Sequence, residues 1–249
     1  MEDYLYQDLY ELEDQHWWHR AKRALALETI SRLKRKKILS ARPKLLDLGC
    51  GTGRNLQAFA KSNEVYGLDF SKEAVRFCEK RGLKKVKQAS AMETPYEDGK
   101  FEFITALDII EHTDDQAVLK ECWRILQPGG AMLITVPAYQ WAWSKWDEVL
   151  HHQRRYTRAS LRAVLEEQGF MIKKISYLYS FLLLPAVIVR KIKDLFYPDQ
   201  YPSDFKLSNS LINVVLEKLC ALERIVFWKL GIPFGTSVVA IAVKPNDEK

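Results

Sequence analysis

The chain has 249 residues, of which 47% are hydrophobic and 28% are charged. This composition excludes disordered, collagen-like and disulfide-stapled proteins. Lysine and arginine outnumber aspartate and glutamate by 38 to 32, and the net charge of +6 permits an anionic partner without requiring one. The cysteines are far apart and form no C-x-x-C pair, so we expect neither a disulfide framework nor a zinc ribbon, and a reducing cytoplasm is the expected compartment.

Residues 1–42 are predicted to form an N-terminal helical cap. Segments 2–12 and 16–39 both show a helical pattern, and Pro43 follows them. The acidic first segment contains no continuous apolar stretch, so we expect no secretory signal there.

Residues 43–249 are predicted to form one α/β domain, because strands and helices alternate after Pro43. We expect strands at 44–48, 65–69, 86–89, 101–107, 131–136, 171–177 and 237–243, and helices at 54–61, 72–81, 114–126 and 158–167. This alternation implies a doubly wound parallel sheet with right-handed crossovers.

The most specific motif is a glycine-rich loop, LLDLGCGTG at 45–53, between the first strand and the next helix. Glycines there let the backbone approach a ligand closely. Asp69, at the end of the second strand, can accept hydrogen bonds from both ribose hydroxyls of a nucleoside. The spacing is G-x-G-x-G, not the dinucleotide pattern G-x-G-x-x-G, so the loop suits a nucleoside that carries no pyrophosphate.

Together with its neighbours, this loop resembles the class I S-adenosylmethionine (SAM)-dependent methyltransferases, in their small-molecule, type 11-like branch. The matching stretches are LLDLGCGTG (45–53), VYGLDF (65–70), SAMETPYEDGKFEFITALDIIEH (90–112) and LKECWRILQPGGAMLITVP (119–137). The resemblance implies a Rossmann-like sheet of about seven strands, the last one antiparallel. It also implies SAM as the cofactor and S-adenosylhomocysteine as its product.

The resemblance further implies which residues hold the cofactor. The glycine loop would face the methionine part of SAM, Asp47 would orient its amino group, and Asp69 would bind the ribose. Phe70 would pack on the adenine, and Ser90 stands where the family often has an aspartate. The full expected set is Asp47, Gly49, Cys50, Gly51, Gly53, Asp69, Phe70, Ser90, Ala91, Met92 and Asp108.

The acceptor is expected to bind at loop 138–156, after the fifth strand, because such sheets place substrates beyond the carboxyl ends of their strands. The candidate catalytic residues are His112, His151, Arg155 and Tyr156, with Arg154 beside them. A histidine can take a proton from the acceptor, and an arginine pair can bind carboxylate or phosphate. Two alternatives remain: His112 hydrogen-bonds its own loop, and the arginines pair with acids in a lid that packs on residues 1–40.

Loop 138–156 also resembles a subgroup that is associated with glycosyltransferase and lipid-linked sugar pathways. Five of the seven tryptophans lie either here or in the cap, at Trp17, Trp18, Trp141, Trp143 and Trp146. We predict that these two segments meet over the cofactor cleft. The histidine pairs His16/His19 and His151/His152 lack a good set of carboxylate and thiolate ligands nearby in the sequence, so no metal site is expected.

Residues 178–235 are predicted to form an apolar helical insertion before the last strand. Its first part, 177–196, either packs in the core or a dimer interface, or lies on a membrane surface with its basic end toward anionic headgroups. Packing is the favoured interpretation, and its apolar run is too short to span a bilayer. We therefore expect a cytoplasmic monomer or homodimer, with peripheral contact at the inner membrane face as the alternative, and no nucleic-acid partner.

The predicted function is methyl transfer from SAM to a small acceptor. O-methylation of an anionic or amphipathic metabolite, a sugar or a lipid-linked intermediate is favoured. The alternatives are N-methylation of a small amine, and a non-catalytic SAM-binding subunit that docks on a membrane or a partner.

Overall fold

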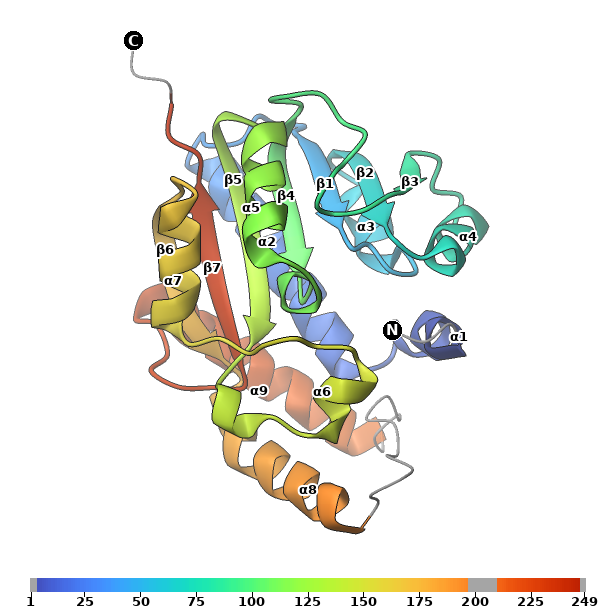
Figure 1. The fold of residues 1–249 in the computed structure, drawn as a ribbon, viewed down its shortest axis with the longest axis vertical. Helices are drawn as coiled ribbons and strands as arrows, with labels where there is room; N and C mark the ends of the chain where they lie inside the picture. The colour runs from blue at the N-terminus through green and yellow to red at the C-terminus, as the bar shows by residue number, and fades with distance from the viewer. Residues whose placement is uncertain (1–3, 197–209, 247–249) are drawn as a thin grey trace.

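A single mixed sheet organises the computed structural model, which describes residues 4–196 and 210–246. Its strand order is β3-β2-β1-β4-β5-β7-β6 (Figure 1). The strands are β1 (Lys44–Leu48), β2 (Glu64–Asp69), β3 (Val86–Gln88), β4 (Phe101–Leu107), β5 (Leu126–Pro137), β6 (Met171–Leu178) and β7 (Ser237–Val243). Strands β1 to β5 pair in parallel, and β7 runs antiparallel to both β5 and β6. The predicted doubly wound sheet with an antiparallel last strand is confirmed.

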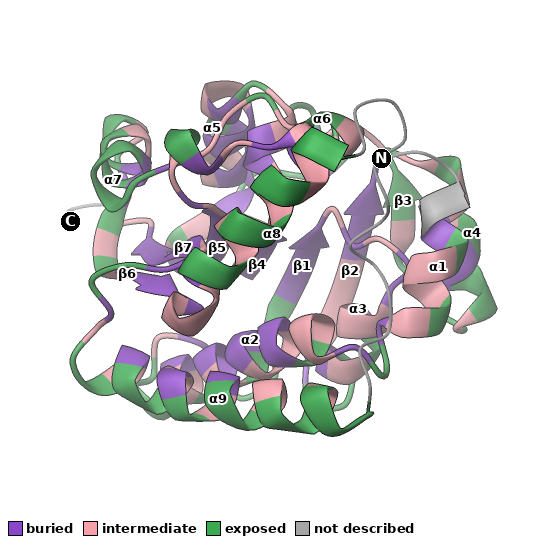
Figure 2. Cartoon of the chain, turned by 90° about the horizontal axis from the view of Figure 1, so that it is seen from below, coloured by how far each residue is buried: buried purple, intermediate pink, exposed green. Residues whose placement is uncertain are grey.

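Helices cover both faces of this sheet, which explains why its central strands are continuous apolar runs. Figure 2 shows α5 on one face and α2 with α9 on the other, with buried strands between them. The helices are α1 (Tyr4–Leu12), α2 (Trp17–Arg35), α3 (Arg54–Phe59), α4 (Lys72–Lys80), α5 (Asp115–Ile125), α6 (Lys145–Val149), α7 (Arg158–Glu167), α8 (Leu183–Phe196) and α9 (Ser210–Lys229). Short 3₁₀ turns lie at η1 (Ile110–His112), η2 (Gln140–Ala142) and η3 (Ser180–Leu182).

The two largest differences between predicted and observed boundaries have local reasons. The helix expected at 16–39 ends at Arg35, because Lys37 takes a left-handed conformation (φ 57°) and the Ile38 amide folds back to the Leu33 carbonyl at 3.0 Å. The strand expected at 131–136 begins earlier, at Leu126, because Leu126 pairs with Phe101 on β4.

The insertion before the last strand contributes α8 and α9. Helix α9 packs along α2, whereas α8 lies apart from it, beside α6 (Figure 1). The expected break at 198–210 lies almost wholly outside the described residues. Within the described ranges, none of the helices is both long enough and apolar enough to span a bilayer.

Candidate cofactor and acceptor site

A large cleft of about 1880 Å³ opens at the carboxyl ends of β1, β2 and β4. This is where open α/β sheets bind their ligands. The cleft is lined from several directions: by α1 and α2, by the glycine loop, by the loop after β5 and by α8. Its volume exceeds the 300–1,000 Å³ typical of a small-molecule pocket, so a cofactor and an acceptor can share it.

The glycine loop forms one wall of the cleft, and its backbone amides already donate hydrogen bonds within the protein. The Gly49 and Cys50 amides donate to the Leu68 carbonyl at 2.8 and 3.0 Å, and the Gly51 amide donates to Oδ2 of Asp69 at 2.8 Å. Position 49 requires glycine, because its φ is +69° and a Cβ there would lie 1.9 Å from Ile109 Cδ1. These loop amides are therefore not available to hold a pyrophosphate.

The end of β2 presents a ribose acceptor next to an open apolar wall. Asp69 lines the cleft, and its Oδ1 also accepts from the Ser71 amide at 3.0 Å. Burial raises the pKa of Asp69, against the lowering effect of these backbone hydrogen bonds. Phe70 and Met92 both line the cleft, yet they are 79% and 44% exposed. Together they form an exposed apolar surface on which a flat ring can pack. A carboxylate beside such a surface fits an adenosine group.

Most of the expected cofactor residues line this cleft, and two do not. Those that do are Gly49, Cys50, Gly51, Asp69, Phe70, Ser90, Ala91, Met92 and Asp108. Asp47 lies beneath the loop instead, where it accepts a hydrogen bond from Thr105 Oγ1 at 2.5 Å and burial raises its pKa to about 7. Gly53 also lies behind the wall, at the N-terminus of α3, with Cys78 against it.

The expected acceptor-side residues divide in the same way. His112, His151 and Arg155 line the cleft. Tyr156 is 3% exposed, and its hydroxyl donates to Asp115 Oδ2 at 2.7 Å, so the structure corrects the expectation that it acts on the acceptor. Arg154 is 3.0 Å from Oδ1 of the same Asp115 and also points away from the cleft.

Arg155 reaches the cleft edge with its guanidinium already paired. Its Nε donates to Asp147 Oδ1 at 2.8 Å and its Nη2 to Oδ2 at 2.9 Å, while Nη1 donates to the Ala138 carbonyl at 3.0 Å. Hydrogen bonds from His152 and Arg155 hold the pKa of the Asp147 carboxyl well below its usual range despite burial. The geometry therefore favours the lid interpretation of the arginines over direct acceptor binding.

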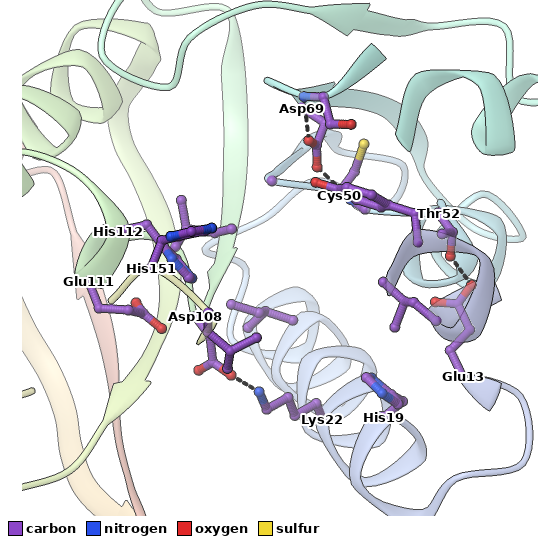
Figure 3. Close-up of a pocket in the computed structure, with 18 of the residues that line it drawn as sticks. Glu13, His19, Lys22, Cys50, Thr52, Asp69, Asp108, Glu111, His112 and His151 are labelled. Carbon is purple, nitrogen blue, oxygen red and sulfur yellow. Dashed lines mark hydrogen bonds and ion pairs between the residues drawn. The ribbon is translucent and has the colours of Figure 1, made fainter. Parts of the chain in front are cut away.

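The deep end of the cleft gathers titratable side chains from α2, β4 and η1 (Figure 3). Lys22 of α2 forms an ion pair with Asp108, which also accepts from Thr135 Oγ1 at 2.8 Å. Glu111 is completely buried, and burial raises its pKa to about 8. Burial also lowers the pKa of Lys22 to about 7 and that of His112 to about 4, so the His112 ring is neutral at pH 7.

Two residues that line this end of the cleft have unusual backbone conformations. Asp108 has φ 57° and His151 has φ 58°, in the left-handed region that non-glycine residues rarely adopt. Such conformations concentrate at functional sites, where surrounding contacts enforce them. Here they aim both side chains into the cleft.

Helix α1 covers the glycine loop from outside. Its end carries Glu13, which accepts a hydrogen bond from Thr52 Oγ1 and lies 2.6 Å from Arg81 Nη2. Burial raises the pKa of Glu13, whereas Thr52 and Arg81 oppose that shift. The cap is thus attached to the loop by a nearly buried polar cluster.

The tryptophan-rich segments meet the cleft only in part. Trp17, Trp18 and Trp146 line it, so both segments do border it. Trp141 and Trp143 do not: Trp141 is 58% exposed and stacks on Tyr139 with ring centroids 5.3 Å apart. Trp18 packs on Tyr179 at 4.5 Å, which fixes the cap to the end of β6 rather than to the loop after β5.

Lys22 and Glu111 line the cleft but are not among the site residues predicted from sequence. Lys22 stands in an ordinary helical pattern, and only the path of α2 across the cleft brings it to Asp108. Glu111 did carry a signal, because it adjoins His112 directly after a strand that ends in the cleft.

The sheet order, the glycine loop and the Asp69 wall together define a class I SAM-dependent methyltransferase fold with its cofactor cleft. Comparison with known proteins agrees: residues 46–134 match the family model of the methyltransferase domain, so this part of the chain is similar to that family. The residues present fit SAM, since the cleft offers a ribose acceptor, an open ring-stacking surface and no pyrophosphate anchor at the loop.

Individual relatives cover only part of the chain. It is 30% identical, over 52% of each chain, to a Mycolicibacterium smegmatis protein named "Probable S-adenosylmethionine-dependent methyltransferase". It is 38% identical to the demethylmenaquinone methyltransferase of a Geobacillus strain, over 36% of this chain and 43% of that one. The matches thus span about half the length of these relatives or less.

A solved structure matches over nearly the whole chain. A chain of the Haloferax volcanii complex that contains the Trm112 methyltransferase activator superposes with a TM-score of 0.61, covering 96% of this chain and 94% of that one at 20% identity. At this identity the match shows the fold, including the part outside residues 46–134.

Proposed function

We propose that the protein transfers a methyl group from SAM to a small acceptor, most simply at an oxygen atom. The observation that carries this proposal is the continuity of one cleft from the Asp69 and Phe70 wall to the buried cluster around His112. SAM supplies a methyl group on a sulfonium, and its departure leaves a neutral thioether. The chain's own residues therefore need to align the acceptor and to take its proton.

Within this proposal, His112 and His151 are the candidate bases. His112 is neutral near pH 7 because burial lowers its pKa to about 4, so its ring can accept a hydrogen bond from an acceptor hydroxyl. Asp47 and Gly53 support the glycine loop from behind. Arg155 acts as a positioning residue through Asp147 rather than as an acceptor ligand.

The acceptor is proposed to be amphipathic, because α8 connects the cleft to an exposed apolar surface. Ala186, Val189 and Arg190 of this helix line the cleft. Figure 2 shows that much of α8 is exposed. Besides Val189, its exposed large apolar side chains are Leu184, Ile188, Ile192, Leu195 and Phe196. Lys191 and Lys193 add positive charge along the same helix.

This surface supports a peripheral membrane contact through 177–196 that presents a lipid-linked acceptor to the cleft. The favoured sequence interpretation is packing either in the core or in a dimer interface. Core packing is not met over most of α8, because of its described side chains only Leu183 is buried. Alternatively the surface contacts a second copy of the chain.

Cofactor binding is the first test. Calorimetric titration with SAM should show one site in the wild type and a loss of at least ten-fold in affinity for Asp69→Ala, with Glu64→Ala as a matched control elsewhere on β2. The absence of heat with the wild type would contradict the proposal.

The acceptor is identified by incubating host extracts with the protein and SAM that carries an isotopically labelled methyl group. Mass spectrometry should reveal a labelled product, and fragmentation distinguishes O- from N-methylation. SAM binding without any labelled product would instead favour the non-catalytic binding subunit.

The membrane contact is tested by flotation with anionic liposomes. The wild type should float at low salt and less so at high salt, and Leu195→Asp should abolish flotation while Met171→Asp, also exposed but on β6, should not. Failure of the wild type to float would exclude the membrane contact and leave the dimer, which sedimentation measures directly.

A further inference from the structure

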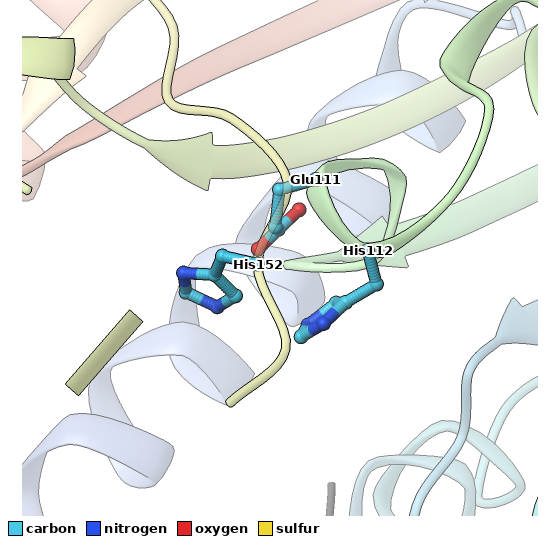
Figure 4. A group of neighbouring side chains, drawn as sticks. All are labelled: Glu111, His112 and His152. Atoms are coloured by element: carbon cyan, nitrogen blue, oxygen red, sulfur yellow. The ribbon is translucent and has the colours of Figure 1, made fainter. Parts of the chain in front are cut away.

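Three side chains at the deep end of the cleft converge on one point (Figure 4). Glu111 and His112 come from η1 after β4, and His152 comes from the loop after α6. One ligand atom from each lies within 4.8 Å of the other two. No spacing rule reveals this trio, because the loop after β5 must fold back over η1 to bring His152 there; the Gln153 amide does so by donating to the Glu111 carbonyl at 2.7 Å.

Glu111 is the unusual member of the trio. Its side chain is fully buried, and neither carboxylate oxygen has a hydrogen-bond partner among the described residues. Buried carboxyl oxygens usually have a hydrogen-bond partner or lie on a cation. Both oxygens of Glu111 are therefore open to a cation, which would stabilise the deprotonated form that burial alone disfavours.

The charges of Lys22 and Arg155 lower the pKa of Glu111, but each of these cations forms its ion pair with another carboxylate. Lys22 forms its ion pair with Asp108, and the Arg155 guanidinium is bidentate with Asp147. Each of these cations thus has a carboxylate of its own. Glu111 is the carboxylate left over, and it faces two histidine rings.

The His152 ring is oriented from behind as metal-bound histidines usually are, and the His112 ring also has hydrogen-bond partners in the backbone. The Nδ1 atom of His152 lies 2.8 Å from Oδ1 of Asp147, which leaves Nε2 for a ligand. Asp147 is itself immobilised by Arg155 and by the Ser144 amide at 2.9 Å. The His112 ring is held by backbone hydrogen bonds to Leu150 and His151. A carboxylate or carbonyl behind the ring fixes the tautomer and the orientation of a ligating histidine.

We propose that Glu111, His112 and His152 bind a divalent transition-metal ion of the Zn²⁺ or Fe²⁺ type. Two imidazole nitrogens and one carboxylate are a ligand set that such ions accept, with positions left open for a further ligand. Metal bonds of roughly 2.1 Å place ligand atoms about 3.4 Å apart, so the three side chains need to close by about 1 Å. The histidine pairs seen in the sequence lack a carboxylate beside them. In the structure, Glu111 supplies that carboxylate next to His152.

The open positions of this ion face the cleft. The use we infer for it rests on the proposed function: it would bind the acceptor oxygen and lower the pKa of its hydroxyl. With the ion bound, His112 would serve as a ligand and not as the base, so the proton leaves to His151 or to water. The oxygen lone pair then forms the new bond to the methyl carbon, and the carbon–sulfur bond breaks to give S-adenosylhomocysteine. Binding of the ion itself does not depend on this use.

The test is direct metal binding by the full chain after treatment with a chelator. Zn²⁺ titrated by calorimetry should bind one ion per chain with micromolar or tighter affinity. Co²⁺ should give visible absorption bands without a thiolate charge-transfer band, since the proposed ligands include no cysteine. Glu111→Gln and His152→Asn should each weaken binding at least ten-fold, whereas His19→Gln, which changes another cleft histidine, should leave the affinity unchanged.

SAM affinity, measured on the same variants, reports whether they fold and separates the two proposals. The metal inference is overturned if Zn²⁺ does not bind, or if binding survives both Glu111→Gln and His152→Asn while SAM still binds. If the ion binds as described but neither SAM binding nor methyl transfer is found, the metal site stands and the proposed function fails.

Discussion

The Arg155 guanidinium and the Asp147 carboxylate form a two-point ion pair inside the protein, with N–O distances of 2.8 and 2.9 Å. The Asp147 side chain is fully buried, and that of Arg155 is only 5% exposed. The pair ties the two ends of the loop after β5 together. An arginine that looks from sequence like an acceptor ligand is therefore an internal brace of the lid.

Arg155→Ala is expected to destabilise the fold by about 3 kcal/mol, because it leaves the Asp147 charge buried without its main partner. Urea unfolding measures the change. Arg162→Ala is the matched control, since Arg162 pairs with Glu166 on the surface and should cost less than about 1 kcal/mol. Equal losses of stability in the two variants would show that the internal pair contributes no more to stability than a surface pair.

Asp47→Asn is expected to stabilise the ligand-free protein in a pH-dependent manner. Burial raises the pKa of Asp47 from 3.8 to about 7, so the folded state favours the protonated form and the stabilisation present below pH 3.8 is lost as the pH rises toward 7. Asparagine carries no charge, so its advantage should grow from near zero at pH 4 to a limit of about 4 kcal/mol above pH 7. Thermal unfolding between pH 4 and pH 8 gives the curve, and a difference independent of pH would contradict this account.

Gly49→Ala is expected to lower stability by more than about 2 kcal/mol, because the new Cβ would lie 1.9 Å from Ile109 Cδ1 and the residue sits at φ +69°. Adding Ile109→Ala should recover only part of the loss, since it removes the clash but leaves the backbone strain. Gly82→Ala is the control: its φ is +76° and its Cβ would meet nothing within 4 Å, so it isolates the strain alone. Full recovery in the double variant would mean that strain at Gly49 is negligible.

Glu13→Ala is expected to weaken SAM binding several-fold, because it removes the contact from α1 to Thr52 and Arg81 at the glycine loop. Calorimetry measures the affinity. Glu11→Ala, two residues earlier, in the last turn of α1 and exposed, should bind SAM like the wild type. Unchanged affinity in Glu13→Ala would show that the cap does not contribute to the cofactor side.

The cofactor half of the cleft was predictable from sequence for a physical reason. Gly49 and Gly51 occupy left-handed backbone conformations that residues with side chains rarely adopt, and Asp69 must stand at the end of β2. Geometry therefore restricts both residue type and spacing. The sheet was predictable for a similar reason, because its strands are buried on both faces and read as apolar runs.

The acceptor half was not predictable, because its residues arrive from separate parts of the chain. Lys22, Glu111 and His152 meet only after α2, η1 and the loop after α6 have packed, and no local pattern marks them as neighbours. The same packing buries Tyr156 in the core, where its hydroxyl donates a hydrogen bond to Asp115. Polar residues in a substrate loop can equally build the loop or face the substrate, and only the three-dimensional arrangement distinguishes the two.

The self-satisfied glycine loop has a consequence for selectivity among adenosine compounds. ATP and NAD share adenine and ribose with SAM, so the Phe70 wall and Asp69 alone cannot reject them. At the loop, however, their phosphates would find the Gly49 and Gly51 amides already donated within the protein, and would approach the carboxylates of Asp69 and Glu13. The methionine part of SAM also carries a carboxylate, but its ammonium and sulfonium groups leave it with a net positive charge, so it meets less of this repulsion. We therefore expect the loop to favour SAM over phosphorylated nucleosides.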